Sequence, residues 1–405
     1  MKKVIYFLVA FLLVLTGCNK TNNKSNSTTT NNNSSTTQEN DNSQGDNTTP
    51  TTPDEKSELS FKIGNDGTYY VVSGIGEFNG TNLVIPETYK NLPVKEIGDS
   101  AFKEYSFIKK VEFPSTLTKI GDYAFYKCRG LETLEFPSGL LSIGDHSFAE
   151  CTHVNKIKFN ERLTTIKDSA FYWCSMLTEV DLPASITNYG LGSFSSCNNL
   201  MKVTIRNRVS NSKGSVFEKC YRLVEVYNLS GKQLSDNWFS DGVGVVKIVH
   251  TSLNEKSIIE EDANGFIFAN VSGTYYLINY LGTNSKITLP SSYKNSNYIL
   301  NRYAFLHKDI IQEVIILNNI TEIDVRTFAS CPSLVKATLP NSIAKMVKQC
   351  FYDSTSFETI VYQGTMAQFN SITFIEDGSA NKYGRWNSLG YDLYIVCTDG
   401  TITVK

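Results

Sequence analysis

Residues 120–139 read IGDYAFYKCRGLETLEFPSG, residues 143–162 read IGDHSFAECTHVNKIKFNER, and residues 166–185 read IKDSAFYWCSMLTEVDLPAS. The three stretches align at a step of 23 residues, and phenylalanine recurs at that step on both sides: Phe102, Phe125, Phe148, Phe171, Phe194 and Phe217. A period of 20 to 29 residues with several apolar columns indicates a solenoid, in which each coil buries its apolar side only against its neighbours.

Other apolar columns keep the same step. One runs through Val111, Leu134, Ile157, Val180, Val203 and Val226, and a second lies two residues further on, at Phe113, Phe136, Phe159, Leu182 and Ile205. This alternation predicts a short strand with one buried face in each coil. Proline follows the strand at positions 114, 137 and 183 and is expected to end it.

The repeat pattern L-x-x-I-x-x-x-A-F-x-x-C-x-x-L-x-x-L-x-F-P resembles that of the BspA-like leucine-rich repeat proteins, a family of bacterial and protist surface proteins. The residues that fill it are Leu117, Ile120, Ala124, Phe125, Cys128, Leu131, Leu134, Phe136 and Pro137. The resemblance implies a β-rich α/β solenoid, a right-handed leucine-rich-repeat superhelix with caps. It also implies adhesion to host or matrix proteins or to other cells. Tyr189 and Ser212 depart from the second aliphatic column, so irregular coils are expected there.

A second copy of the pattern follows the first. Gly67-Thr68-Tyr69-Tyr70 returns as Gly273-Thr274-Tyr275-Tyr276, IPETYK (85–90) returns as LPSSYK (289–294), and Phe305, Phe328 and Phe351 resume the step of 23. The sequence therefore predicts two tandem arrays, residues 58–262 and 263–405, each with a β-rich opening segment. The stretch YIVCTDGTITV (394–404) predicts two strands around an Asp399-Gly400 turn, as a C-terminal cap.

The first 57 residues predict export and tethering. Lys2 and Lys3 precede the apolar run 4–15, as in a signal peptide, here residues 1–17. The following Leu15-Thr16-Gly17-Cys18 resembles a bacterial lipobox, which implies a lipid on Cys18 and attachment to the outer face of a membrane. Residues 18–57 are rich in Asn, Ser and Thr, and their lack of apolar residues after Cys18 predicts a disordered tether.

Composition argues against two classes of function. The formal net charge of −2 gives no basic field for nucleic acid. No catalytic motif is present: the four histidines share no spacing, and there is no Gly-x-Ser-x-Gly, P-loop or Gly-x-Gly-x-x-Gly. We therefore expect neither an enzyme nor a cofactor.

Two polar ladders invite metal or disulfide chemistry. Cys128, Cys151, Cys174, Cys197 and Cys220 form one, but parallel cysteines on adjacent coils are too far apart for a disulfide and lack Cys-x-x-Cys metal spacing. We expect them to pack as small buried groups. Asp99, Asp122, Asp145 and Asp168 form the other ladder. It is interpreted as caps of the short helical turns that contain Ala-Phe, in preference to a calcium site, because each coil offers one carboxylate and calcium needs about six to eight oxygens.

The candidate partner-binding residues are of two kinds: aromatic residues beside the phenylalanine column, Tyr126, Tyr172 and Trp173, and charged residues on the outer strand face, Glu135, Lys158 and Asp181. Aromatic residues gathered on a surface favour partner contact. The charged face is equally consistent with simple solvation of an exposed sheet.

The leading hypothesis is a lipid-anchored extracellular protein that binds a protein or glycan through its solenoid surface. Alternatives are a solute-binding lipoprotein of an uptake system, a passive surface scaffold, and an enzyme in the aperiodic segments. The last of these would use titratable residues such as Asp241, His250, Glu376 and Asp377.

Overall fold

The computed structural model describes residues 58–206, 214–234, 239, 248–347, 349–375 and 392–404. Residues Asp54–Lys405 form one compact unit. The signal peptide, Cys18 and the tether lie outside the described residues, as do Ser212, Asp241, Glu376 and Asp377.

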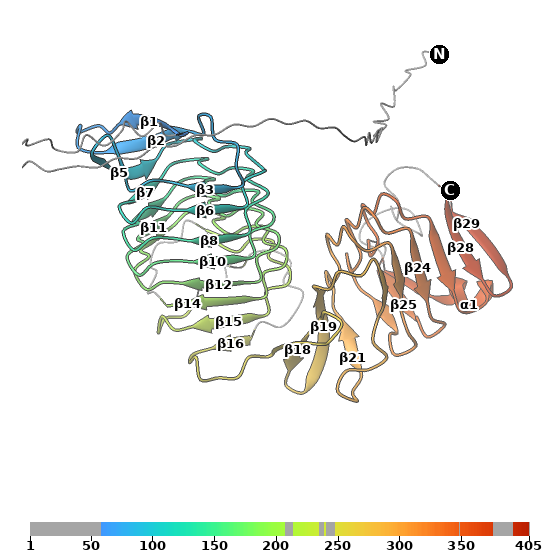
Figure 1. Ribbon diagram of the computed structural model, residues 1–405. Coiled ribbons are helices and arrows are strands. Elements are labelled where there is room, and N and C mark those ends of the chain that lie inside the picture. The colour runs from blue at the N-terminus through green and yellow to red at the C-terminus, as the bar shows by residue number, and fades with distance from the viewer. Residues whose placement is uncertain are drawn as a thin grey trace, which may run out of the picture. The chain divides into compact units, whose positions relative to one another are not determined.

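The described chain is a β-solenoid, which confirms the fold class (Figure 1). Most coils of the N-terminal stack, strands β1 to β16, contribute one strand to each of two rows. The first row is one sheet in the order β1-β2-β5-β7-β9-β11-β13, with β4 on β5. Its strands are β1 (Ser60–Ile63), β2 (Tyr70–Gly74), β4 (Thr88–Tyr89), β5 (Leu92–Ile97), β7 (Lys119–Ile120), β9 (Ser142–Ile143), β11 (Thr165–Ile166) and β13 (Asn188–Tyr189).

The second row of the N-terminal stack carries the strands that the Val111 column predicts. Its parallel ladders are β3-β6, β8-β10 and β12-β14-β15-β16. The strands are β3 (Asn82–Val84), β6 (Lys110–Glu112), β8 (Thr133–Glu135), β10 (Lys156–Lys158), β12 (Glu179–Leu182), β14 (Lys202–Ile205), β15 (Glu225–Asn228) and β16 (Ile248–His250). Leu134 pairs with Ile157, so the step of 23 is also the register of the sheet.

The C-terminal stack, strands β17 to β29, repeats this plan in three sheets. The first holds β17 (Ile259–Glu261), β18 (Phe266–Val271), β19 (Thr274–Tyr280) and β21 (Tyr298–Leu300). The second holds β20 (Lys286–Thr288), β22 (Glu313–Ile315), β24 (Lys336–Leu339), β26 (Thr359–Tyr362), β28 (Leu393–Cys397) and β29 (Gly400–Val404), and the third β23 (Glu322–Ile323), β25 (Lys345–Val347) and β27 (Thr373–Ile375). The antiparallel pair β28–β29 confirms the two strands predicted at the C-terminal end.

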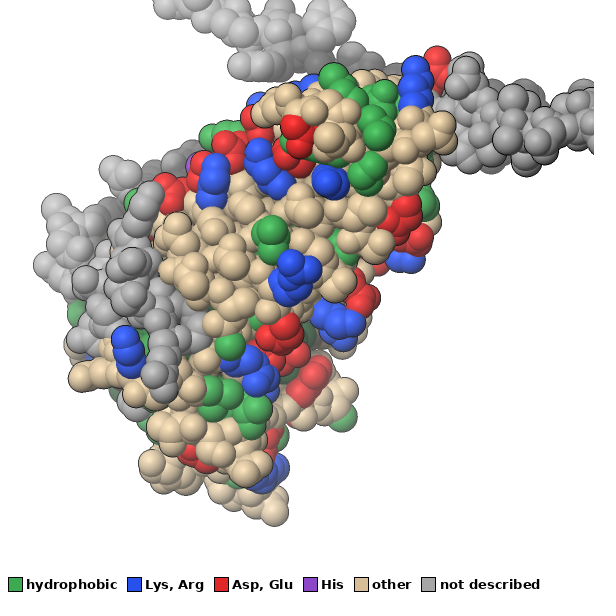
Figure 2. Space-filling view, turned by 90° about the vertical axis from the view of Figure 1, so that its left-hand side faces the viewer, with side chains coloured by type: hydrophobic (Ala, Val, Ile, Leu, Met, Phe, Trp, Pro, Cys, Tyr) green, Lys and Arg blue, Asp and Glu red, His purple; other side chains and the backbone are tan. Residues whose placement is uncertain are grey.

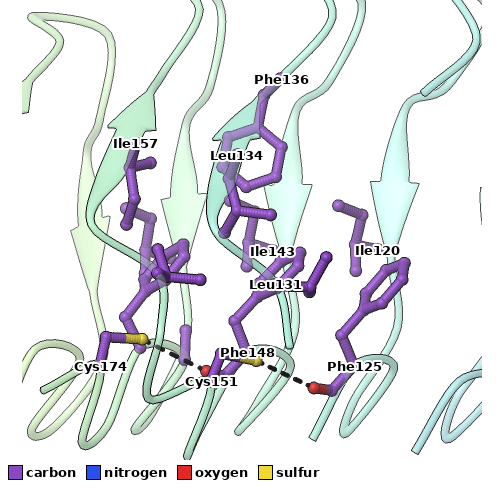
Figure 3. Packing of buried hydrophobic residues seen from close by; sticks show 14 of the residues in the cluster. Ile120, Phe125, Leu131, Leu134, Phe136, Ile143, Phe148, Cys151, Ile157 and Cys174 are labelled. Carbon is purple, nitrogen blue, oxygen red and sulfur yellow. Dashed lines mark hydrogen bonds between the residues drawn. The ribbon is translucent and has the colours of Figure 1, made fainter. Parts of the chain in front are cut away.

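The core of the N-terminal stack is a column of stacked phenylalanine rings. Successive rings from Phe102 to Phe217 have centroids 5.0, 5.1, 5.4, 5.0 and 5.6 Å apart, and all six are buried. Leu134 and Ile157 from one row and Ile120 and Ile143 from the other fill the space beside the rings (Figure 3). Because aromatic rings at this spacing add to the gain from burial, each coil is held by the coil before it.

The cysteine column lies in this core, as predicted, and each thiol has a definite partner. The Sγ of each cysteine donates to the backbone oxygen of the phenylalanine 26 residues earlier, at 2.9 to 3.4 Å from Cys128 to Cys220 and at 3.0 Å for Cys331. Figure 3 shows two of these bonds. Ser354 occupies the same repeat position one coil after Cys331, and its hydroxyl makes the same bond to Phe328, at 2.8 Å.

The aspartate ladder joins coils, so the prediction that each aspartate caps its own turn is wrong. The Oδ1 of Asp99 accepts the backbone N–H of Asp122 at 2.8 Å, and Asp122, Asp145 and Asp168 accept in the same way from the residue 23 positions later. The Ala-Phe segments are turns, and α1 (Met366–Ser371) is the helix of the described residues. Because the turns stack directly on one another, the N–H of each turn points towards the coil before it. The aspartate carboxylate of that preceding coil accepts this N–H.

The coil that contains Tyr189 is not irregular, contrary to the expectation from the sequence. Tyr189 is fully buried in β13 and pairs in register with Ile166, so its coil is regular despite the change of residue type. The two opening segments are alike: stacked rings of Phe61 and Tyr89, 4.2 Å apart, correspond to Phe268 and Tyr293, 3.9 Å apart. The division of the chain between residues 262 and 263 stays a prediction.

Candidate functional site

The turns that follow the first row of strands form one edge of the N-terminal stack, here called the turn edge (residues 98–109, 121–132, 144–155, 167–178 and 190–201). Two residues of each turn have a left-handed backbone. They are Ser100, Tyr123, His146, Ser169 and Gly192 at the first position, and Glu104, Lys127, Glu150, Trp173 and Ser196 at the second. The non-glycine residues at these positions are half-buried or exposed, so large side chains there are surface features.

Tyr126 lies in a cluster of aromatic and charged side chains on the turn edge. Its hydroxyl donates to Glu150 at 2.8 Å, and this bond raises the pKa of Tyr126. Its ring lies 5.6 Å from that of Tyr123, and the ammonium groups of Lys103 and Lys127 lie 5.6 and 5.0 Å from its centre. The ring is half-buried and held in place by these contacts, so it contributes both apolar and polar surface to the turn edge.

Tyr172 and Trp173 lie two coils further along the same edge. Their rings are 6.5 Å apart in an edge-to-face arrangement, and Trp173 is exposed, with exposed Met176 near it in the same turn. Phe107 and Leu191 are also exposed on turns of this edge. Exposed apolar side chains gathered along one edge are typical of contact surfaces.

The charged candidates lie on the other side of the coil, on the outer face of the second row. Glu135 on β8 forms an ion pair with Lys158 on β10, and Asp181 on β12 accepts two hydrogen bonds from Arg206 at 2.7 and 2.9 Å. Exposed pairs of this kind contribute little free energy. Figure 2 shows one face of the molecule, on which basic and acidic side chains are interspersed and apolar ones form small separate groups.

The structure therefore brings Tyr172 and Trp173 together, places Tyr126 on the same edge, and separates these three from Glu135, Lys158 and Asp181. Sequence reasoning missed Tyr123 and Met176. Tyr123 could have been found, because it occupies the same repeat position as Gly192. Glycine often marks a left-handed turn, and this predicts a left-handed backbone at the equivalent positions. Met176 carried no such signal.

A different polar cluster lies beside the last two strands of the N-terminal stack, β15 and β16. His250 lies between Glu225 and Glu255, with ring nitrogens 3.0 and 2.9 Å from their carboxylates. Glu225 is fully buried and also accepts from Ser257 and the N–H of Ile258. These bonds fasten residues 250–258 onto β15 and β16. His250, one of the residues considered for catalysis, is therefore part of a structural network.

The described residues contain no group of three or more histidine, cysteine, aspartate or glutamate side chains able to hold a metal ion. In the aspartate ladder, Lys167 Nζ lies 3.0 Å from Asp122 and 3.3 Å from Asp145, and so occupies the space between two carboxylates. Nor does this part of the chain include a helix with the length and apolarity needed to cross a membrane.

Stacked 23-residue coils with a strand, a buried phenylalanine and a turn in each define a leucine-rich-repeat protein. The family described as BspA type Leucine rich repeat region (6 copies) matches residues 77–158, 118–243 and 278–383. The chain belongs to this family, as the repeat pattern predicted. A search of curated proteins found no match.

Solved structures with similarity to the chain include leucine-rich repeat proteins from bacteria. The T. pallidum leucine-rich repeat protein is 29% identical over 43% of this chain and 80% of its own, with a TM-score of 0.39. A leucine-rich cell surface protein from Faecalibacterium prausnitzii is 20% identical over 78% and 96%, with a TM-score of 0.35. A leucine-rich repeat protein from Bacteroides ovatus is 22% identical over 79% and 87%, with a TM-score of 0.37.

Proposed function

We propose that this protein is displayed on the outside of a cell, held there by a lipid on Cys18, and binds extracellular macromolecules through the turn edge. The observation that carries the proposal is the row of aromatic and apolar side chains along the turn edge, in which Tyr126 and Tyr172 share one repeat position two coils apart and Trp173 follows Tyr172. A solenoid presents such a row as a long shallow surface, which suits a protein or glycan better than a small substrate.

Charge supports the choice of the turn edge over the strand face. Glu135, Lys158 and Asp181 are each paired with an oppositely charged neighbour, so none of the three offers an uncompensated charge to a partner. Trp173 and Met176 are exposed on the turn edge. Contact there would remove apolar surface from water at about 25 cal/mol per Å².

The test is a binding screen with the full-length chain purified in mild detergent. The chain is titrated by biolayer interferometry against extracellular-matrix proteins, host-cell glycans and small solutes. Saturable binding to a protein or glycan is expected, with at least a ten-fold loss when Tyr126, Tyr172 and Trp173 are changed together to alanine. Binding to small solutes alone, or turnover of an ester, peptide or glycoside, would overturn the proposal.

A further inference from the structure

One pocket combines an apolar rim with two buried cations. It has a volume of about 460 Å³, and Trp173 and Met176 of the turn edge line it together with Leu281 and Ile310. These four side chains are 38%, 46%, 39% and 45% exposed. The pocket lies within the compact unit Asp54–Lys405 and falls in the range of about 300 to 1,000 Å³ typical of ligand sites.

Arg222 forms part of the pocket wall and is fully buried. Its guanidinium donates to the backbone oxygens of Asn198 at 2.6 Å, Leu306 at 2.6 Å and Ala304 at 3.2 and 3.3 Å. The N–H groups are thus satisfied by neutral carbonyls. Burial lowers the pKa of Arg222 to about 9.

Lys308 is the second buried cation, with 8% of its surface exposed. Its ammonium group has three N–H donors, and within the described residues one partner accepts from it, the side-chain oxygen of Asn199 at 2.9 Å. Among the residues that the structure describes, no carboxylate lies within ion-pair distance of Lys308 or Arg222. Asp309, which also lines the pocket, is exposed.

Two buried positive charges with no carboxylate at ion-pair distance among the described residues are costly, and an anion that entered the pocket would reduce this cost. Burial and the charge of Arg222 lower the pKa of Lys308 well below its ordinary value, in agreement with that imbalance. The apolar rim indicates what kind of anion fits. Met176, Leu281 and Ile310 offer aliphatic surface that inorganic phosphate cannot use and that a sugar uses poorly, whereas side chains beside an acidic residue would pack on it.

We propose that this pocket binds an acidic peptide segment, with a glutamate or aspartate carboxylate on Lys308 and flanking apolar side chains on Trp173, Met176, Leu281 and Ile310. The inference rests on the proposed function, because Trp173 belongs to both surfaces, and it adds the chemistry of the partner. Arg222 contributes charge from the wall, while Lys308 supplies the free donors.

The probe is a set of capped heptapeptides with a central glutamate flanked by leucine, isoleucine or phenylalanine, each paired with its glutamine counterpart. Fluorescence anisotropy with the full-length chain is expected to give at least ten-fold tighter binding for the glutamate peptides. Lys308→Met should reduce that ratio to within two-fold. Its Tm should be no lower than that of the parent, because methionine keeps the volume and removes a buried charge. The control Lys156→Met changes an exposed lysine on β10 and should keep the preference.

Equal binding of the glutamate and glutamine peptides would overturn the inference, as would a preference that survives Lys308→Met. Tighter binding of a glucuronate-containing oligosaccharide than of any peptide would assign the pocket to acidic sugars instead. These outcomes differ from failure of the proposed function. In that case the full-length chain would bind no macromolecule, while its preference among peptides could still be measured.

Discussion

At the scale of single residues, the cysteine column shows how a small side chain can be specific. Each thiol fills a space between coils and also satisfies the carbonyl of a buried phenylalanine. Burial raises the pKa of Cys128 to about 12, so the column stays in the thiol form that can donate. Ser354 shows that a hydroxyl performs the same task within this chain.

Replacing Cys151 separates the contribution of the thiol hydrogen bond from that of packing between coils. Cys151→Ala removes one of the two donors to the oxygen of Phe125, the other being the N–H of Cys128 at 3.0 Å, and opens a small cavity, so the free energy of unfolding should fall by about 2 kcal/mol. Cys151→Ser restores the donor and should lose about half as much. Urea denaturation of both variants checks this expectation. An alanine variant as stable as the serine variant would show that the hydrogen bond contributes nothing.

The left-handed turn positions give a second residue-scale prediction. Ser169 has a φ of 53°, and Gly192 holds the same position one coil later with a φ of 61°. Ser169→Gly should raise the free energy of unfolding by about 0.5 to 1 kcal/mol, because glycine adopts this conformation without steric cost. Ser142→Gly, in strand β9, is the matched control and should be destabilising. If the two changes had the same sign, backbone strain at Ser169 would not be the cause.

At the scale of elements, the repeat predicted the second-row strands and the phenylalanine and cysteine columns from spacing alone. Such features follow from one coil packing on an identical coil. The C-terminal hairpin was predicted from its Asp399-Gly400 turn, and the first-row strands were not predicted. The repeat spacing could not predict the hydrogen bonds of the aspartates. Whether each carboxylate accepts an N–H of its own turn or of the next coil depends on how the turns stack. Tyr126, Tyr172 and Trp173 were found by residue type, whereas Arg222 and Lys308 were not, since residues far apart in sequence bring them together.

The stability of the fold should depend on pH through Glu255, in the segment 250–258. The hydrogen bond from His250 and the N–H groups of Thr251 and Ser252 lower the pKa of Glu255 from 4.5 to about 2. A lowered pKa in the folded state means that the stabilisation is present above pH 4.5 and is lost as the pH falls towards 2. The Tm of the parent should therefore fall across this range.

Glu255→Gln isolates the contribution of this carboxylate. The variant should have a lower Tm than the parent at pH 6 and a smaller fall in Tm between pH 4.5 and 2, because glutamine does not titrate. Differential scanning calorimetry at several pH values measures both quantities. An unchanged slope in the variant would assign the acid dependence to other carboxylates.

At the scale of the whole molecule, the proposed anchor at Cys18 and the proposed binding surface on the turn edge belong to separate segments. The lipobox resemblance predicts that Cys18 carries the lipid, and Cys18→Ala should move the protein from the membrane pellet to the soluble fraction after cell fractionation. The coils do not depend on that residue, so the variant should keep its macromolecule binding. Retention of the alanine variant in the membrane would point to a different anchor.

We propose that the turn edge, and not the outer face of the second row of strands, binds the partner. The most direct test compares two matched triple variants of the full-length chain against the macromolecule found in the binding screen. Alanine at Tyr126, Tyr172 and Trp173 should raise the dissociation constant at least ten-fold, whereas alanine at Glu135, Lys158 and Asp181 should change it less than two-fold at physiological salt. The reverse order of the two effects would contradict the account and assign binding to the strand face.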